Sequence, residues 1–268
     1  MSFSFILHAQ MTKFVSPKKH LGQHFLTNDR VAHRIAESLT GHGNYKKVVE
    51  VGPGMGMLTH FLLEMPYEIY VVEYDTESVS YLKAHYPKLQ QHIIEADFLN
   101  YDLNKISDGP LAIIGNFPYN ISSQILFKVF ENYNKVPELV GMFQKEVAER
   151  VCSGPGNRDY GILSVLLQAW YDMEYLFSVD ENQFHPKPKV QSGVLRMKRN
   201  AINSLDCDEK LFKTVVKTAF NQRRKTLRNA LRSMCSDSDF LADKLLDKRA
   251  EQLTVAEFIY LTKKIKTA

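Results

Sequence analysis

Four consecutive residues near the middle of the chain combine groups that can hold a planar ring bearing an amine. Asn116, Phe117, Pro118 and Tyr119 follow the apolar run 111–115, which predicts a buried strand that ends at this turn. The Asn116 side-chain carbonyl and a backbone carbonyl freed by the fixed φ of Pro118 can each accept one N–H of an exocyclic amine. Tyr119 can stack on the ring, a contact worth roughly 1–3 kcal/mol. Surface turns use the same residue types, so these residues alone leave both interpretations open.

A glycine-rich turn lies upstream of them. The run 47–51 predicts a strand, Gly52, Gly54 and Gly56 follow it, and residues 57–63 have the pattern of an amphipathic helix. Strand, glycine turn and helix form the first unit of a doubly wound nucleotide-binding fold, where glycine lets the backbone approach a ligand. The spacing is G-x-G-x-G and not the dinucleotide G-x-G-x-x-G. By itself, the turn still leaves a nicotinamide dehydrogenase open as an alternative.

Acidic residues end the next two predicted strands. Glu73 follows the run 68–72 and lies about 20 residues beyond Gly52, the position of an acid that binds a ribose diol. Asp97 follows the run 92–94, and its carboxylate can accept from the amino group of adenine. Helix caps and solvated loops also use acids. The regular placement of glycine, two acids and then Asn116 at successive strand ends nevertheless favours one nucleotide-binding site at one edge of a parallel sheet.

Further segments carry a resemblance to a known family. Residues 18–26 resemble the motif K-x-x-G-Q-N-F-L, 143–150 resemble Q-K-E-V-A-x-R, 184–190 match F-x-P-x-P-K-V, and 220–229 match F-x-Q-R-R-K-T-L-R-N. Over residues 17–265 the chain resembles the ribosomal RNA adenine dimethyltransferases (the kasugamycin-sensitivity family) of the small subunit. This resemblance implies an enzyme that uses S-adenosyl-L-methionine to dimethylate N6 of two adjacent adenosines. It places both adenosines in the 3′-terminal hairpin of small-subunit (16S) rRNA, during small-subunit biogenesis.

The resemblance also implies roles for individual residues. The implied cofactor contacts are His24, Leu26, Gly52, Gly54, Glu73, Asp97 and Asn116. Asn116, Pro118, Tyr119 and the carbonyl of Phe117 are expected to hold the target base, and Phe184 is expected to stack on its second face. His24 stands where the family usually has Asn, and Phe117 where it has Leu. No metal is expected, because a sulfonium methyl is already activated and catalysis can come from alignment.

Charge is distributed unevenly along the chain. The net charge is +4, but residues 196–268 hold 17 basic and nine acidic side chains, so this segment carries +8 and the rest −4. Arg224, Arg228 and Arg232 recur every four residues, which predicts one basic helical face. Basic faces are often merely solvated, but the absence of acids from 210–236 favours a phosphate-binding surface. The expected RNA contacts are Arg223, Arg224, Lys225, Arg228, Lys187 and Lys189.

The chain is predicted to divide into an extension or arm (1–16), an S-adenosylmethionine-binding methyltransferase domain (17–200) and a helical RNA-binding domain (201–268). The fold class is α/β. The resemblance implies a Rossmann-like seven-stranded methyltransferase sheet with an antiparallel last strand, and a small all-helical C-terminal domain. Runs 171–179 and 191–197 are predicted to be the closing strands, and Asn28 to cap a helix through Ser38. Residues 1–10 are expected to be a dispensable extension.

Three scattered cysteines do not form a disulfide framework, and no apolar run is long enough for a membrane span, which favours a cytoplasmic protein. The expected partner is small-subunit rRNA within the pre-30S or 30S particle, with no membrane and no metal, and the family precedent implies a monomer. Two alternatives remain open: a macrolide-resistance-type methyltransferase acting on large-subunit rRNA, and a non-catalytic ribosome assembly factor. The 223–229 segment favours the small-subunit enzyme over the first of these.

Overall fold

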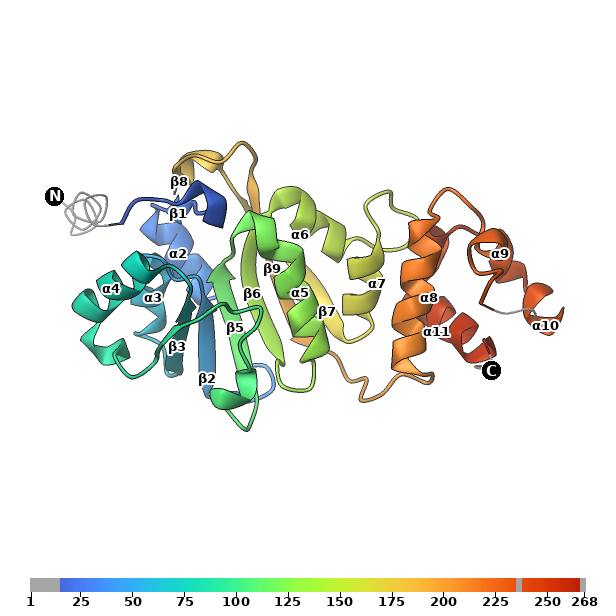
Figure 1. The fold of residues 1–268 in the computed structure, drawn as a ribbon, viewed down its shortest axis with the longest axis horizontal. Coiled ribbons are helices and arrows are strands. Elements are labelled where there is room, and N and C mark those ends of the chain that lie inside the picture. Colours follow the sequence, from blue (N-terminus) through green and yellow to red (C-terminus); the bar gives the residue numbers. More distant parts are fainter. Residues whose placement is uncertain (1–14, 235–237, 266–268) are drawn as a thin grey trace. The chain divides into compact units, whose positions relative to one another are not determined.

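A seven-stranded sheet is the main element of the computed structural model, which describes residues 15–234 and 238–265 (Figure 1). Across the sheet the strands are β4 (Ile93–Glu95), β3 (Glu68–Glu73), β2 (Lys47–Val51), β5 (Leu111–Asn116), β6 (Glu138–Gln144), β9 (Ser192–Arg199) and β7 (Tyr171–Val179). β4, β3, β2, β5 and β6 run parallel, whereas β9 is antiparallel to β6. The predicted seven-stranded methyltransferase sheet with an antiparallel last strand is therefore confirmed.

Helices pack on both faces of this sheet (Figure 1). They are α2 (Asp29–Ala36), α3 (Met57–Leu62), α4 (Thr76–His85), α5 (Ser122–Glu131) and α6 (Lys145–Cys152). Asn28 caps α2 as predicted, because its side chain accepts hydrogen bonds from the backbone N–H groups of Arg30 and Val31 at 2.9 and 3.2 Å. The helix ends at Ala36, before the predicted Ser38.

Short 3₁₀ helices occupy several connections: Lys19–Leu21, Pro87–Leu89, Leu103–Lys105, Tyr119–Ile121, Glu181–Gln183, Lys244–Asp247 and Ala250–Gln252. A separate two-stranded antiparallel sheet joins β1 (Phe25–Leu26) to β8 (Phe184–His185), with Leu26 opposite Phe184. This pairing brings the N-terminal segment beside the 184–190 loop.

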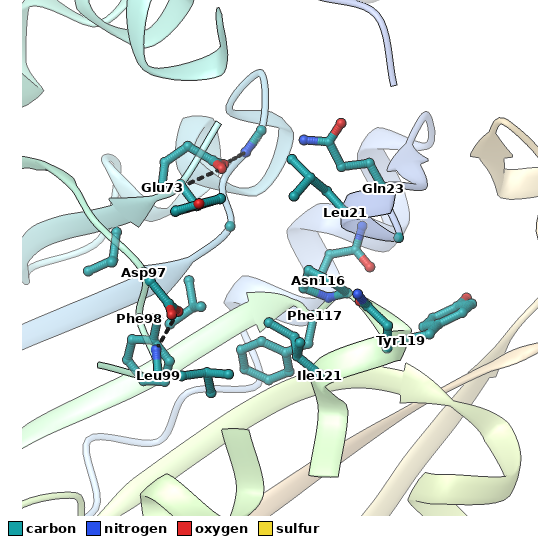
Figure 2. Close-up of a pocket in the computed structure, with 18 of the residues that line it drawn as sticks. Leu21, Gln23, Glu73, Asp97, Phe98, Leu99, Asn116, Phe117, Tyr119 and Ile121 are labelled. Atoms are coloured by element: carbon teal, nitrogen blue, oxygen red, sulfur yellow. Dashed lines mark hydrogen bonds between the residues drawn. The ribbon is translucent and has the colours of Figure 1, made fainter. Parts of the chain in front are cut away.

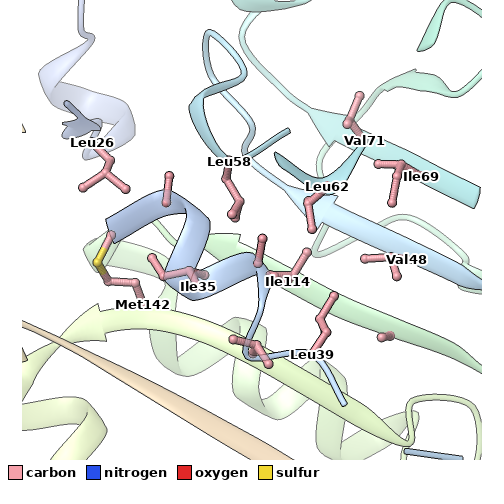
Figure 3. Close-up of a cluster of buried hydrophobic side chains, with 14 of the residues drawn as sticks. Leu26, Ile35, Leu39, Val48, Leu58, Leu62, Ile69, Val71, Ile114 and Met142 are labelled. Carbon is pink, nitrogen blue, oxygen red and sulfur yellow. The ribbon is translucent and has the colours of Figure 1, made fainter. Parts of the chain in front are cut away.

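The core of the sheet explains why its strands are nearly continuous apolar runs. Parallel strands covered by helices are buried on both faces, so alternation with polar residues is lost. Figure 3 shows Ile35, Leu58 and Leu62, from α2 and α3, beside the sheet side chains of Val48 and Ile114. All five side chains are at most 3% exposed. This layer fixes the strand ends from which the site is built.

The described residues group into two compact units. One holds the residues up to Ala148 together with Glu174–Arg199, and the other holds Glu149–Met173 with the residues from Asn200 onward. The sequence analysis assigned 149–173 to the methyltransferase domain, whereas here this segment clusters with the C-terminal helices. Arg158 contributes to that grouping, because its carbonyl accepts a hydrogen bond from the Arg223 guanidinium.

The second unit is built from helices around its own core. These are α7 (Ile162–Gln168), α8 (Glu209–Asn221), α9 (Leu227–Ala230), α10 (Ser238–Leu241) and α11 (Val255–Lys264). Phe220 and Phe258 stack at a centroid distance of 5.9 Å, and the ring of Tyr160 meets Phe220 edge-on at 6.2 Å. Across residues 15–234 and 238–265, no helix is both long and apolar enough to cross a membrane.

Candidate active site

A cavity of about 340 Å³ lies where the parallel strands β2, β3, β4 and β5 end. Its lining comes from each of these strand ends and from the N-terminal segment: Leu21–Phe25, Val51, Gly52, Gly54, Val72–Tyr74, Ala96–Leu99 and Asn116–Ile121. Figure 2 shows Glu73 and Asp97 on one side of the cavity and Asn116 and Tyr119 on the other. Gly52, Gly54, both acids and the Asn-Phe-Pro-Tyr turn singled out in the sequence therefore share one cavity, whereas Gly56 does not line it.

Glu73 is held by backbone N–H groups at the end of β3. Its Oε2 accepts from the Gly54 N–H at 3.0 Å, and its Oε1 accepts from the N–H groups of Tyr74 and Asp75 at 2.9 Å each. The side chain is 6% exposed. Burial raises the pKa of Glu73, while the three backbone donors oppose that rise. A carboxylate has about four acceptor positions, so it retains capacity for a ligand hydroxyl.

The glycine turn brings its backbone close to this acid. Gly52, Gly54 and Gly56 all have positive φ, at 67°, 56° and 84°. A Cβ at Gly54 would lie 2.9 Å from a ring carbon of Phe25, so both the conformation and the space require glycine. The turn thus lines the cavity with Gly52 and Gly54, and the Gly54 N–H donates to Glu73.

Asn116 ends β5 with its amide oriented by the N-terminal segment. Its Nδ2 donates to the carbonyl of His24 at 2.9 Å, and its Oδ1 accepts no hydrogen bond from any residue that the structure describes. The Phe117 carbonyl likewise accepts none within the described ranges, while the Phe117 N–H donates to the Met142 carbonyl at 3.1 Å. Two carbonyl acceptors therefore remain available at this end of the cavity.

Two glycines make room for the Phe117 ring, which is 1% exposed. A Cβ on Gly141 would lie 2.2 Å from the Phe117 Cε2 atom, and one on Gly115 would lie 2.8 Å from its Cε1 atom. The ring also meets Phe143 at a centroid distance of 4.9 Å. The chain accommodates the phenylalanine ring because β5, which leads into this turn, and the adjacent strand β6 each carry a glycine beside it.

Tyr119 is half-buried and fixed at both its hydroxyl and its ring. The hydroxyl and the Ser192 Oγ form a hydrogen bond of 2.6 Å, and the ring stacks on His24 at a centroid distance of 5.4 Å with an interplanar angle of 28°. Burial raises the pKa of Tyr119, so the phenol stays neutral at physiological pH. Its ring is thereby presented to the cavity in a defined orientation.

Two predicted site residues lie outside this cavity. Leu26 and Phe184 face each other in the β1–β8 pair and are 4% and 5% exposed within the main core cluster. Antiparallel partners place their side chains on the same face of a sheet, so the two residues are buried together. The predicted stacking of Phe184 on a target base and the predicted cofactor contact of Leu26 are not supported by these positions.

The sequence analysis missed several lining residues, chiefly Leu21, Gln23 and Tyr74. It also missed the network that holds the N-terminal segment in place. Asp75 is 2% exposed and accepts hydrogen bonds from the side chains of Lys18, Ser78 and Gln23. Burial opposes ionisation, but these donors keep the pKa of Asp75 below its usual range. The position of Asp75 as the N-cap of α4 was the available sequence indication.

The predicted basic helical face is not formed, which corrects the sequence analysis. α8 ends at Asn221 and α9 begins at Leu227, so Arg224 lies in the turn between them. The break is stabilised because the Leu227 N–H donates to the Lys248 carbonyl and not to its own helix.

The predicted RNA-binding cations fall into two groups. Three have partners within the protein: Arg223 lies 4.0 Å from Glu251, Arg228 pairs with Asp247 at 2.6 Å, and Lys187 donates to Asn182 at 2.7 Å. By contrast, Arg224, Lys225 and Lys189 are exposed, and in the described part of the chain their side chains have no ion-pair or hydrogen-bond partner; the same holds for the side chain of Arg232. The partnered cations help hold the fold, and the others can reach a phosphate.

Glu50 is a buried acid beneath the glycine turn. It is 2% exposed and accepts a hydrogen bond of 2.5 Å from the Thr59 hydroxyl. Burial, together with the nearby charge of Glu73, raises the pKa of Glu50 from 4.5 to about 8. Folding therefore takes up a proton on Glu50 between these two pH values.

This proton uptake predicts a pH-dependent stability. An acid whose pKa is raised by folding binds more protons in the folded state, so the free energy of unfolding falls as pH rises from about 5 to about 8 and then levels off. Glu50→Gln removes this contribution. The free energy of unfolding of the variant, relative to that of the wild type, should therefore be higher at pH 8 than at pH 5 by at least about 1.4 kcal/mol. Urea unfolding of both proteins at several pH values measures the difference, and parallel pH profiles would contradict the assignment.

Comparison with known proteins places the chain in a family. The family model described as ribosomal RNA adenine dimethylase matches residues 15–266. A Flavobacterium johnsoniae protein named ribosomal RNA small subunit methyltransferase A is 57% identical over 252 residues, which cover 94% of this chain and 96% of that protein. The Bacteroides thetaiotaomicron protein of the same name is 55% identical over 258 residues, covering 96% of each chain.

Solved structures share the fold at lower identity. A dimethyladenosine transferase from Plasmodium falciparum has a TM-score of 0.75 at 21% identity, covering 89% of this chain and 96% of that one. The 23S rRNA methyltransferase ErmE has a TM-score of 0.66 at 24% identity, covering 89% and 99%. The family match and the relatives at 55–57% identity confirm the resemblance drawn from the motifs, and the solved structures show the same fold. The chain belongs to the ribosomal RNA adenine dimethylase family of S-adenosylmethionine-dependent methyltransferases.

Proposed function

We propose that the protein transfers methyl groups from S-adenosylmethionine to N6 of two adjacent adenosines in the 3′-terminal hairpin of 16S rRNA. The observation that carries the chemistry is the pair of available acceptors at the end of β5, the Asn116 Oδ1 and the Phe117 carbonyl, beside the Tyr119 ring. The names of the bacterial relatives, at 55–57% identity, support the small subunit as the source of the RNA.

The glycine turn and the two acids of the cavity suit the cofactor. The Gly52 and Gly54 turn lets a ligand approach the backbone, Glu73 retains acceptor capacity for a ribose diol, and Asp97 is half-buried at the next strand end. The two acids also favour a cationic ligand. When bound, S-adenosylmethionine would supply an activated sulfonium methyl group to the N6 lone pair, with the carbon–sulfur bonding pair left on sulfur and the N6 proton released to solvent.

The residues at the end of β5 would activate the amine by hydrogen bonding. The lone pair of an adenine amine is delocalised into the ring, which makes it a poor nucleophile. Accepting both N–H groups at Asn116 and Phe117 draws the nitrogen toward a tetrahedral form, and the Tyr119 ring holds the base in plane. A base that is paired and stacked in an RNA helix cannot enter this cavity, so an adenosine in an unpaired loop is the expected substrate.

The RNA itself would be held by the exposed cations outside the cavity. Arg224, Lys225 and Arg232 in the helical unit, and Lys189 in the 184–190 loop, are the residues proposed to contact phosphate. Binding through them is expected to weaken steeply with salt. We place the reaction in the cytoplasm, with the protein acting as a monomer on the pre-30S or 30S particle.

Methyl transfer to unmodified small ribosomal subunits tests the proposal directly. The protein is incubated with S-adenosylmethionine and either small or large subunits, and the digested rRNA is analysed by mass spectrometry. N6,N6-dimethyladenosine in the 3′-terminal hairpin of the small-subunit rRNA is the expected product. Methylation of large-subunit RNA alone would replace the proposal with the resistance-type activity. Binding of cofactor and particles without any methylated adenosine would favour an assembly factor.

A further inference from the structure

His24 lines the end of the cavity that also holds Asn116 and Tyr119. Its ring stacks on Tyr119, and its Nδ1 lies 2.7 Å from the carbonyl of Pro186 in the 184–190 loop. Its own carbonyl accepts the hydrogen bond from the Asn116 amide. One residue thus joins the N-terminal segment to the Asn-Phe-Pro-Tyr turn and to the loop that follows β8. None of these contacts is to Glu73 or Asp97, the acids on the other side of the cavity.

The imidazole contributes a contact that asparagine cannot make. An asparagine side chain at this position could form a hydrogen bond but would offer no ring to stack against Tyr119. In this chain the Tyr119 ring is restrained by two groups, the Ser192 hydroxyl at its phenol and His24 at one face. The contact between His24 and Pro186 in turn restrains the imidazole. Tyr119 is therefore fixed more firmly than the hydroxyl contact alone would allow.

We propose that His24 is a positioning residue for the target base, which acts through Tyr119 and matters most for the second methyl transfer. The inference rests on the proposed function. An unmodified adenine amine offers two N–H groups, one for the Asn116 Oδ1 and one for the Phe117 carbonyl. After the first transfer only one N–H remains, so the alignment of the monomethylated base depends more on stacking. A loosened Tyr119 ring should consequently slow the second transfer more than the first.

Three substitutions separate the ring from the hydrogen bond. His24→Asn keeps a hydrogen-bonding group without a ring, His24→Phe keeps a ring without the bond to Pro186, and His24→Ala removes both. The matched control is His20→Asn, the same change at an exposed histidine of the same segment. For each protein, single-turnover methyl transfer to unmodified small subunits gives the ratio of monomethyl to dimethyl adenosine, and calorimetry gives the Kd for S-adenosylhomocysteine.

The ratio of monomethyl to dimethyl product is the decisive measurement. We expect it to rise roughly 3- to 10-fold in His24→Asn and His24→Ala, the range for loss of one aromatic pair, and to stay close to wild type in His24→Phe and His20→Asn. The Kd for S-adenosylhomocysteine should change less than about twofold in every variant.

Two results would overturn the inference. The first is an unchanged product ratio together with a slower rate that is explained by weaker binding of S-adenosylhomocysteine. This result would make His24 a cofactor contact. A faster second transfer in His24→Ala would mean that the imidazole obstructs the base. If the wild type itself methylates no small-subunit adenosine, the proposed function fails first, and that result is distinct from either of these.

Discussion

Replacing Asn116 by alanine is expected to reduce methyl transfer by about 100- to 1,000-fold, the usual cost of removing one preorganised polar group from a reacting centre. The Asn116 amide acts both as a donor and as an acceptor. Its Nδ2 is bound to the His24 carbonyl, which directs Oδ1 to the position proposed for the amine. Alanine removes the acceptor and leaves the Phe117 carbonyl alone, so the N6 lone pair stays largely delocalised.

The same variant tests the proposed division of labour between cavity and basic surface. Binding of Asn116→Ala to small subunits should remain as salt-sensitive as that of the wild type, because Arg224 and Lys225 are unchanged. Its Kd for S-adenosylhomocysteine should weaken by no more than about tenfold, roughly the effect of one hydrogen bond. Single-turnover rates, filter binding at several salt concentrations and calorimetry measure the three quantities.

Asn104→Ala is the matched control, because this exposed asparagine lies in a short 3₁₀ helix and does not line the cavity. The control should behave as wild type in all three assays. Loss of particle binding together with methyl transfer in Asn116→Ala would contradict the separation of base activation from RNA binding. Retained methyl transfer would contradict the role of Asn116 itself.

The strands and the turns at their ends could be predicted because each apolar run is followed by a residue whose type indicates its role at the strand end. Gly52 supplies a positive φ, Glu73 supplies acceptors, and Asn116 supplies an amide. Because the ends of parallel strands share one edge, these three predictions and that of Asp97 combine into one cavity without any knowledge of long-range contacts. The number of strands in the sheet and its antiparallel last strand came from the family resemblance and not from the periodicity.

The remaining features depend on tertiary contacts that leave no periodic pattern. β1 and β8 are two residues each, so neither the pair nor the burial of Phe184 and Leu26 could be inferred from alternation. The end of α8 has no glycine or proline to mark it; the chain leaves the helix there, and Leu227 bonds to Lys248. Likewise, the acids that pair with Arg223 and Arg228 lie in other segments of the chain. The absence of acids from 210–236 therefore predicted more unpaired basic side chains than the structure has.

Substitution of Gly141 is expected to have the second large effect, because this glycine leaves the space that the Asn-Phe-Pro-Tyr turn needs for its Phe117 ring. A Cβ there would fall 2.2 Å from Phe117 Cε2 and 2.7 Å from Phe143 Cε2, and both rings are fully buried. Gly141→Ala is therefore expected to lower the free energy of unfolding by about 1–3 kcal/mol, the usual cost of overpacking. Since Phe117 adjoins Asn116 and carries the second acceptor, methyl transfer should fall by at least about tenfold.

Phe117→Leu should rescue Gly141→Ala, because leucine lacks the ring-edge atoms that the new methyl group meets. Alone, Phe117→Leu leaves a small void and should cost about 1 kcal/mol. In the double variant the two volume changes offset each other, so the loss of stability should be smaller than the sum of the single effects by at least about 1 kcal/mol, with much of the methyl transfer restored. Gly154→Ala, where a Cβ would meet nothing within 4 Å, is the control. Additive losses of stability across this cycle would show that Phe143, and not Phe117, is the group that requires glycine at 141.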